Sequence, residues 1–196
     1  MKRALVAWSG GKDAAWALHR SRGEFDIAAL VTTVSESDAV VRVHNIPHSR
    51  IAAQADALGI SLWTVHLPQP CPNIEYAARL QPIWSRAARE GIGAILFGDL
   101  FLADIRAWRE NLLATTRLQP VFPLWSQPTA ALAREMIAGG LEAVVCAAGN
   151  PDLIGRDFNE SFLASLPPPV DPCGENGEFH TFVQYMPGFS CPVSFR

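Results

Sequence analysis

The sequence predicts an α/β protein built on a doubly wound parallel β-sheet, with a smaller α/β domain at its C-terminal end. Short apolar runs of strand length alternate along the first half of the chain with longer stretches of helical periodicity. This alternation indicates a parallel sheet covered by helices on both faces. The expected strands are 4–8, 27–34, 62–67 and 94–97, the expected helices are 13–22, 50–58, 73–90 and 102–117, and a helix opened by Pro128 and a strand at 143–147 follow.

Two prolines divide the chain after the helix expected at 102–117. Pro120 and Pro123 interrupt the regular pattern at this point. We therefore expect a domain boundary near Val121, with one domain at 1–121 and a smaller one at 122–196.

The composition is that of a soluble globular protein: 49% of the residues are hydrophobic, 18% are charged, and the net charge is −3. No basic stretch stands out, which argues against a nucleic-acid partner. No apolar stretch is long enough to span a bilayer, which argues against a membrane protein. The four cysteines are widely separated and form no Cys-x-x-Cys pair, so neither a zinc site nor a redox dithiol is indicated. Scattered, reduced cysteines fit the cytoplasm, where we expect the protein.

A glycine-rich turn, Ser9-Gly10-Gly11-Lys12-Asp13, joins the first expected strand to the first expected helix. Its glycines let the backbone approach an anion, and the unpaired amides of the first helical turn point at that anion. Lys12 adds a positive charge, and Asp13 is either the helix N-cap or a ligand for the Mg²⁺ that accompanies ATP. Neither a Walker loop nor a Gly-x-Gly-x-x-Gly fingerprint is present. The turn predicts a phosphate site, with a simple tight turn as the alternative.

Polar residues follow several of the expected strands at their carboxyl ends. In an open parallel sheet, ligands collect at these ends, near the switch in strand order. The residues are Ser9 after the first strand, Thr32 and Thr33 late in the second, and Gly98 with Asp99 after the fourth. The alternative for the threonines is that β-branched residues simply fill a strand.

The segment 171–182 concentrates polar side chains after a run of three prolines. Glu175 and Glu178 lie three residues apart and are followed by His180 and Thr181. Such a set can bind a cationic or amide-bearing substrate, orient a nucleophile, or act as acid and base. The alternative is a glycine turn before a strand, with both carboxylates solvated.

Taken together, five motifs resemble the diphthine–ammonia ligase family, and the resemblance runs nearly from end to end. That family belongs to the pyrophosphatase-loop (PP-loop) group of adenine nucleotide alpha hydrolases, which share a Rossmann-like sheet and cleave ATP between the α and β phosphates. The Gly-Glu-x-Gly-Glu-[Phe/Tyr] segment is the most specific of the motifs. They are the loop 9–13, His44 within 42–45, Gly98-Asp99, Pro123-Leu124-Trp125, and 174–181.

The resemblance implies that the protein forms an amide from a carboxylate and ammonia. A substrate carboxylate would attack the α phosphate of ATP, pyrophosphate would leave, and ammonia would displace AMP from the acyl adenylate. The implied partners are ATP with Mg²⁺, ammonia, and an unidentified carboxylate of a small molecule or a protein side chain. A homodimer is the expected assembly, because it is the commonest one.

The resemblance also implies roles for individual residues. Domain 1–121 would bind ATP, and domain 122–196 would bind the substrate. The implied catalytic residues are Lys12, Glu175 and Glu178, and the implied metal ligands are Asp13 and Asp99. The implied nucleotide contacts are Ser9, Gly10, Gly11, Lys12, Asp13, Ala14, Thr32, His44, Gly98 and Asp99. The implied substrate contacts are Arg156, Glu175, Asn176, Gly177, Glu178, His180 and Thr181.

Two departures from the family pattern leave alternatives open. Ala14 stands where the loop usually has a serine, which keeps open an ATP- or AMP-binding regulatory module without turnover. The segment 179–181 resembles a compact, bacterial-type branch, so the product need not be diphthamide. A third reading, a tRNA-modifying enzyme of the same group, is disfavoured by the acidic balance.

Overall fold

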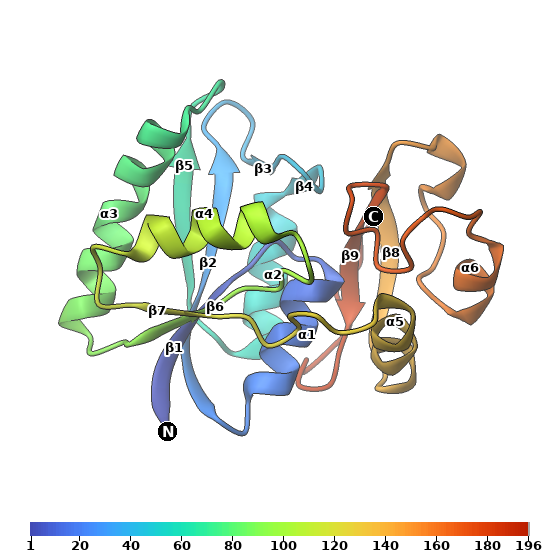
Figure 1. The fold of residues 1–196 in the computed structure, drawn as a ribbon, viewed down its shortest axis with the longest axis horizontal. Coiled ribbons are helices and arrows are strands. Elements are labelled where there is room, and N and C mark those ends of the chain that lie inside the picture. The colour runs from blue at the N-terminus through green and yellow to red at the C-terminus, as the bar shows by residue number, and fades with distance from the viewer. Residues whose placement is uncertain (196) are drawn as a thin grey trace.

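The computed structural model describes residues 1–195 as an N-terminal α/β lobe with a smaller C-terminal lobe beside it (Figure 1). The N-terminal lobe contains five parallel strands in the order β5-β2-β1-β6-β7. The first strand lies at the centre and the winding reverses beside it, as in Rossmann-like folds. The doubly wound parallel sheet expected from the sequence is confirmed. The strands are β1 (Lys2–Ala7), β2 (Phe25–Ser35), β5 (Leu62–Leu67), β6 (Ala94–Leu96) and β7 (Gln119–Val121).

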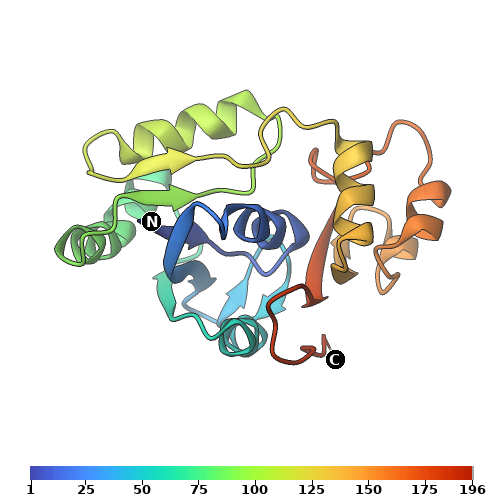
Figure 2. The ribbon, with the colours of Figure 1, turned by 90° about the horizontal axis from the view of Figure 1, so that it is seen from below.

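Helices cover both faces of this sheet, and Figure 2 shows α2 and α4 on opposite sides of it. Alternate side chains along β1 point to opposite faces of the sheet and pack into two separate hydrophobic cores. Ala4 and Val6 pack in the core beneath α1 and α2, whereas Leu5 packs in the core beneath α3 and α4. The helices are α1 (Lys12–Ser21), α2 (His48–Leu58), α3 (Asn73–Arg89) and α4 (Ala103–Leu113).

The edge strand β7 differs from the sequence expectation. Pro120 was expected to interrupt the chain, but Gln119–Val121 pairs with β6 at the edge of the sheet. An edge strand tolerates proline because the missing N–H is not needed by a second neighbour.

The helix expected at 102–117 ends earlier than expected, at Leu113. The hydroxyl of Thr116 donates to the Leu113 carbonyl at 2.8 Å and accepts from the Leu118 amide at 3.1 Å. A side-chain-stabilised turn therefore replaces the last helical turn.

The C-terminal lobe is a two-stranded antiparallel sheet with short helices around it. A β3–β4 hairpin follows β2 in the other lobe. Within residues 1–195, no helix combines the length and the apolar character needed to cross a membrane. These elements are β3 (Val40–Val41), β4 (Ile46–Pro47), α5 (Thr129–Ala138), β8 (Glu142–Ala148), the 3₁₀ helix η1 (Pro151–Leu153), α6 (Glu160–Ser165) and β9 (Phe179–Tyr185).

The two lobes share one hydrophobic core. Phe182 and Val183 of β9 are fully buried and belong to the same cluster as Ala15 and Leu18 of α1. This packing holds β9 against the helix that follows β1, so residues at the start of β9 face the glycine-rich loop (Figure 1).

Candidate functional site

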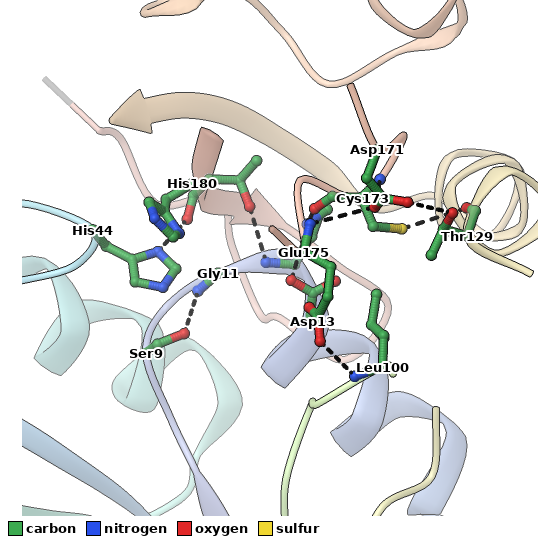
Figure 3. A network of polar contacts seen from close by, with 12 residues as sticks. Ser9, Gly11, Asp13, His44, Leu100, Thr129, Asp171, Cys173, Glu175 and His180 are labelled. Carbon is green, nitrogen blue, oxygen red and sulfur yellow. Dashed lines mark hydrogen bonds and ion pairs between the residues drawn. The ribbon is translucent and has the colours of Figure 1, made fainter. Parts of the chain in front are cut away.

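A cavity of about 390 Å³ lies where the carboxyl ends of β1, β2 and β6 meet the C-terminal lobe. Its polar side is formed by the glycine-rich loop, the residues after β6, and the segment around Glu175 and His180. Figure 3 shows the side chains of His44, Asp13 and Glu175 gathered around the start of α1. Lys12 and Thr181, 169 positions apart in the chain, thus meet at the edge where parallel sheets bind ligands.

One unusual backbone conformation and one close backbone contact shape the glycine-rich loop. Gly10 has a φ of +83°, which L side chains rarely adopt. A Cβ on Gly98 would lie 2.6 Å from the Asp13 carbonyl carbon and 2.7 Å from the Ala14 amide nitrogen. The loop after β6 therefore packs directly on the first turn of α1, the end of a helix that can bind an anion.

Gln54, which the sequence analysis did not single out, ties this loop to the C-terminal lobe. Its Oε1 accepts from the indole nitrogen of Trp8 at 2.9 Å. Its Nε2 donates to the Gly10 carbonyl at 3.1 Å and to the Val183 carbonyl at 2.7 Å. Because an indole N–H only donates and a carbonyl only accepts, these partners fix the orientation of the amide. Gln54 is fully buried and uses both of its amide hydrogens.

We expect Gln54→Met to lower the free energy of unfolding by about 3 kcal/mol, because it leaves three buried polar partners short of a hydrogen bond. Urea denaturation measures the effect. Gln81→Met makes the same chemical change on the exposed surface of α3 and should stay within about 0.5 kcal/mol of the wild type. Equal stability of the two variants would contradict the role assigned to Gln54.

Lys12 is buried, with only 2% of its side chain exposed. Its Nζ lies 2.9 Å from Asp13 Oδ2 and donates to the Cys173 carbonyl. Burial alone would lower the pKa of Lys12, but Asp13, Cys173 and Glu175 together outweigh burial and hold the pKa above its ordinary value. The ammonium is therefore a permanent charge between the loop and the C-terminal lobe.

The start of β9 caps the first turn of α1. The hydroxyl of Thr181 accepts from the Lys12 amide at 3.1 Å, and the Thr181 carbonyl lies 3.0 Å from His44 Nδ1. Since a carbonyl only accepts, Nδ1 carries the hydrogen, and Nε2 is left as an acceptor. Burial and the neighbouring His180 lower the pKa of His44 to about 4, and burial also lowers the pKa of His180. Both rings are therefore neutral at neutral pH.

Asp99 is held by Arg109, a second residue that the sequence analysis did not place in the site. The Arg109 guanidinium donates to both carboxylate oxygens, at 2.6 and 3.1 Å, and lies over the Phe97 ring at 4.5 Å. The one indication in the sequence that Arg109 could reach Asp99 is its position in the helix that follows Gly98-Asp99.

The donor set for a metal ion is sparse. Among residues 1–195, no group of three or more His, Cys, Asp or Glu side chains is arranged to hold a metal. Asp13 Oδ1, however, is buried without a hydrogen-bond partner and lies in the cavity wall. Mg²⁺ commonly takes one or two protein carboxylates and completes its shell with phosphate oxygens and water. Asp13 therefore fits one ligand position for Mg²⁺, whereas both oxygens of Asp99 are engaged by Arg109.

Glu175 is the carboxylate that the C-terminal segment presents to the cavity. Its Oε1 accepts from the Leu100 amide at 2.8 Å. Burial raises the pKa of Glu175 to about 7, with Asp13 and Asp99 adding to the shift and Lys12 opposing it. A carboxyl group with this pKa exchanges protons at neutral pH, as a general acid or base must.

Glu178 instead points back into its own loop, outside the cavity wall. It accepts from the Asp171 amide at 3.0 Å and from the Asn176 amide at 3.0 Å. Burial alone would raise its pKa, but these hydrogen bonds outweigh burial and hold the pKa of Glu178 below its ordinary value. Glu178 thus closes the loop that carries Glu175.

The structure brings many of the residues expected from the sequence to one cavity and leaves others outside its wall. The cavity wall includes Ser9, Lys12, Asp13, Ala14, His44, Gly98, Asp99, Glu175, His180 and Thr181. Outside it lie Gly10, Gly11, Thr32, Arg156, Asn176, Gly177 and Glu178. Thr33, rather than Thr32, lines the cavity, because neighbouring side chains on β2 face opposite sides of the sheet.

An apolar wall completes the cavity on the side of α3. Tyr76, Leu80 and Trp84 follow one another at four-residue spacing and face the sheet. Val31 of β2 and Phe97, which directly follows β6, also line the cavity. The cavity therefore has a polar end at the start of α1 and an apolar end beneath α3.

The fold and the site define a Rossmann-like α/β protein whose glycine-rich loop and polar cavity lie where the strand order reverses. Residues 1–119, more than half of the chain, match the diphthamide synthase N-terminal domain family. The chain belongs to this family. The family relationship expected from the motifs is thereby confirmed.

Named relatives and a solved structure extend this comparison. The diphthine–ammonia ligase of Rattus norvegicus is 28% identical over 214 residues, covering 95% of this chain and 80% of the rat protein. That of Danio rerio is 29% identical, covering 74% of this chain and 64% of the fish protein. The U34-tRNA thiolase NcsA of Methanococcus maripaludis is 15% identical, with a TM-score of 0.42 over 70% of this chain and 57% of the thiolase.

Proposed function

We propose that the protein is an ATP-dependent, AMP-forming ligase that converts a carboxylate into an amide with ammonia. One observation carries the proposal: the segment 174–181 closes directly over the glycine-rich loop, so that Glu175 and Ser9 share one cavity. The names of the curated relatives, diphthine–ammonia ligases, support the same chemistry. Here the carboxylate substrate is a small molecule or a protein side chain.

The polar end of the cavity suits the phosphates of ATP. Ser9 and the part of the first turn of α1 that Thr181 does not cap would hold them, aided by the helix dipole. Ala14 lacks the hydroxyl of a serine, but its backbone amide is retained. The nucleoside would extend toward Thr33 and the apolar wall. His44 Nε2, in the wall of the same cavity, is an available acceptor.

Mg²⁺ would be held by Asp13 through its unpartnered Oδ1, with Asp99 as a second ligand if it leaves Arg109. When bound, the ion neutralises charge that develops on the phosphate oxygens.

The reaction needs no nucleophile from the protein. A carboxylate oxygen of the substrate attacks the α phosphorus, the bond to pyrophosphate breaks, and an acyl adenylate forms. Ammonia then attacks the acyl carbon, the bond to AMP breaks, and the nitrogen loses a proton, which Glu175 is placed to accept. Burial raises the pKa of Cys146 and of Cys173 to about 12, so these thiols stay protonated and unreactive.

We propose that the protein works in the cytoplasm. The four cysteines of the chain are free, which suits the reducing cytoplasm. We propose a homodimer, the commonest assembly of soluble proteins.

Analysis of the nucleotide products tests the proposal. Purified protein with Mg-ATP, ammonium and a cell extract should release AMP and pyrophosphate, and release should depend on both ammonium and the extract. Extract fractions that support AMP release then identify the carboxylate. Release of ADP and phosphate would contradict attack at the α phosphorus. Tight ATP binding without any product would favour the regulatory module.

A further inference from the structure

We propose that Lys12 is a positioning residue that anchors the loop carrying Glu175, and that it is not a ligand of the ATP phosphates. The inference rests on the proposed function, which places the phosphates at Ser9 and the first turn of α1. Its basis is the environment of the Lys12 side chain, which is only 2% exposed and whose ammonium contacts the C-terminal lobe.

Two oxygen partners and two aromatic rings surround the ammonium of Lys12. Nζ pairs with Asp13 Oδ2 at 2.9 Å and donates to the Cys173 carbonyl. It also lies 5.6 Å from the ring centroid of Phe158 and 5.5 Å from that of Phe179, within the range of cation–π attraction. A move of Nζ onto a phosphate would weaken its contacts with these two oxygens, which lie in a buried site.

The contact with Cys173 acts on Glu175 through a short stretch of backbone. Asp171 Oδ1 accepts from the Cys173 amide at 2.8 Å and from the Glu175 amide at 3.3 Å. Lys12 holds the carbonyl of the same Cys173 from the opposite lobe. The turn is thus fixed from within by Asp171 and from the loop side by Lys12, and its end is the Glu175 carboxylate on the Leu100 amide.

The experiment compares Lys12→Met with the wild type by hydrogen exchange and by calorimetric titration with Mg-ATP. Without nucleotide, amides in 171–178 should exchange about tenfold faster in the variant, because the turn loses its anchor. The Kd for Mg-ATP should stay within about threefold. Loss of a lysine–phosphate contact would instead weaken binding by about tenfold to a hundredfold. Leu118→Ala, at a buried site away from the cavity, controls for general loss of stability.

Two results would overturn the inference: a Kd raised tenfold or more in Lys12→Met, or unchanged exchange in 171–178. If the variant does not fold, the wild type decides the question. A lysine that moves to the phosphates would release the loop and speed its exchange when Mg-ATP is added, whereas an anchoring lysine would not. Failure of the proposed function gives a different result: the wild type does not bind Mg-ATP. The exchange comparison between Lys12→Met and the wild type, made without nucleotide, then still tests whether Lys12 anchors the loop.

Discussion

Replacing Gly98 with alanine should lower the free energy of unfolding by about 2 kcal/mol and weaken Mg-ATP binding by at least about tenfold. The new Cβ would lie 2.6–2.8 Å from backbone atoms of Asp13 and Ala14. Backbone atoms cannot rotate away as a side chain does, so either the loop after β6 or the start of α1 must shift. Both segments border the polar end of the cavity, so a shift of either one would misplace the amides proposed to hold the phosphates.

Urea denaturation and calorimetric titration with Mg-ATP measure these two effects. Gly23→Ala is the matched control, because its Cβ meets nothing within 4 Å and its φ is not in the positive range. This control should keep the wild-type affinity and stay within about 0.5 kcal/mol in stability. A Gly98→Ala protein that behaved like the control would show that the contact between the two segments does not shape the site.

The fold was accessible from the sequence because apolar alternation and helical periodicity report directly on burial. The strands expected around 4–8 and 62–67 are present as β1 and β5. The hydrophobic pattern did not predict the short strands that are recognisable only by their hydrogen-bonded pairing. β7 has a central proline, and the β3–β4 hairpin has only two residues in each strand.

The site was accessible only in part, because spacing along the chain does not reveal the direction of a side chain. Glu175 and Glu178 look equivalent in the sequence, yet the turn between them sends one into the cavity and the other back to the loop amides. Gln54 and Arg109 do not belong to any of the sequence motifs. Their partners lie in other segments, and Val183 is 129 residues from Gln54.

Glu175→Gln should make the protein more stable than the wild type at pH 8 and leave its stability unchanged near pH 4. Burial raises the pKa of the Glu175 carboxyl to about 7 from its model-compound value of 4.5. Between these two values the native state holds more protons than the unfolded state, so the stability of the wild type falls as the pH rises through this window. Glutamine stays neutral and can still accept from the Leu100 amide.

The expected gain at pH 8 is about 1–2 kcal/mol. One unit of pKa shift corresponds to about 1.4 kcal/mol, and water reaching this half-buried carboxyl reduces the full effect. Lys12, Asp13 and Asp99 are the charged groups near Glu175, and they remain in both proteins. Thermal unfolding of both proteins across pH 4–8 measures the difference.

Glu178→Gln provides a control of opposite sign. The pKa of Glu178 is held below its ordinary value, so its ionised form stabilises the native loop at pH 8, and this contribution is lost as the pH falls through that lowered pKa. Glu178→Gln should therefore be less stable than the wild type at pH 8. If Glu175→Gln were also destabilised at pH 8, the carboxyl would not be a desolvated group in the cavity.

The Glu175→Gln variant also separates an effect on the reaction from an effect on folding. A Glu175→Gln protein that is more stable than the wild type at pH 8 cannot lose activity there by unfolding. If Glu175 accepts the proton released by ammonia, this protein should form AMP about a hundredfold more slowly in the ammonium-dependent assay and keep its Kd for Mg-ATP. Unchanged turnover in a stabilised Glu175→Gln protein would remove Glu175 from the reaction while leaving its burial established.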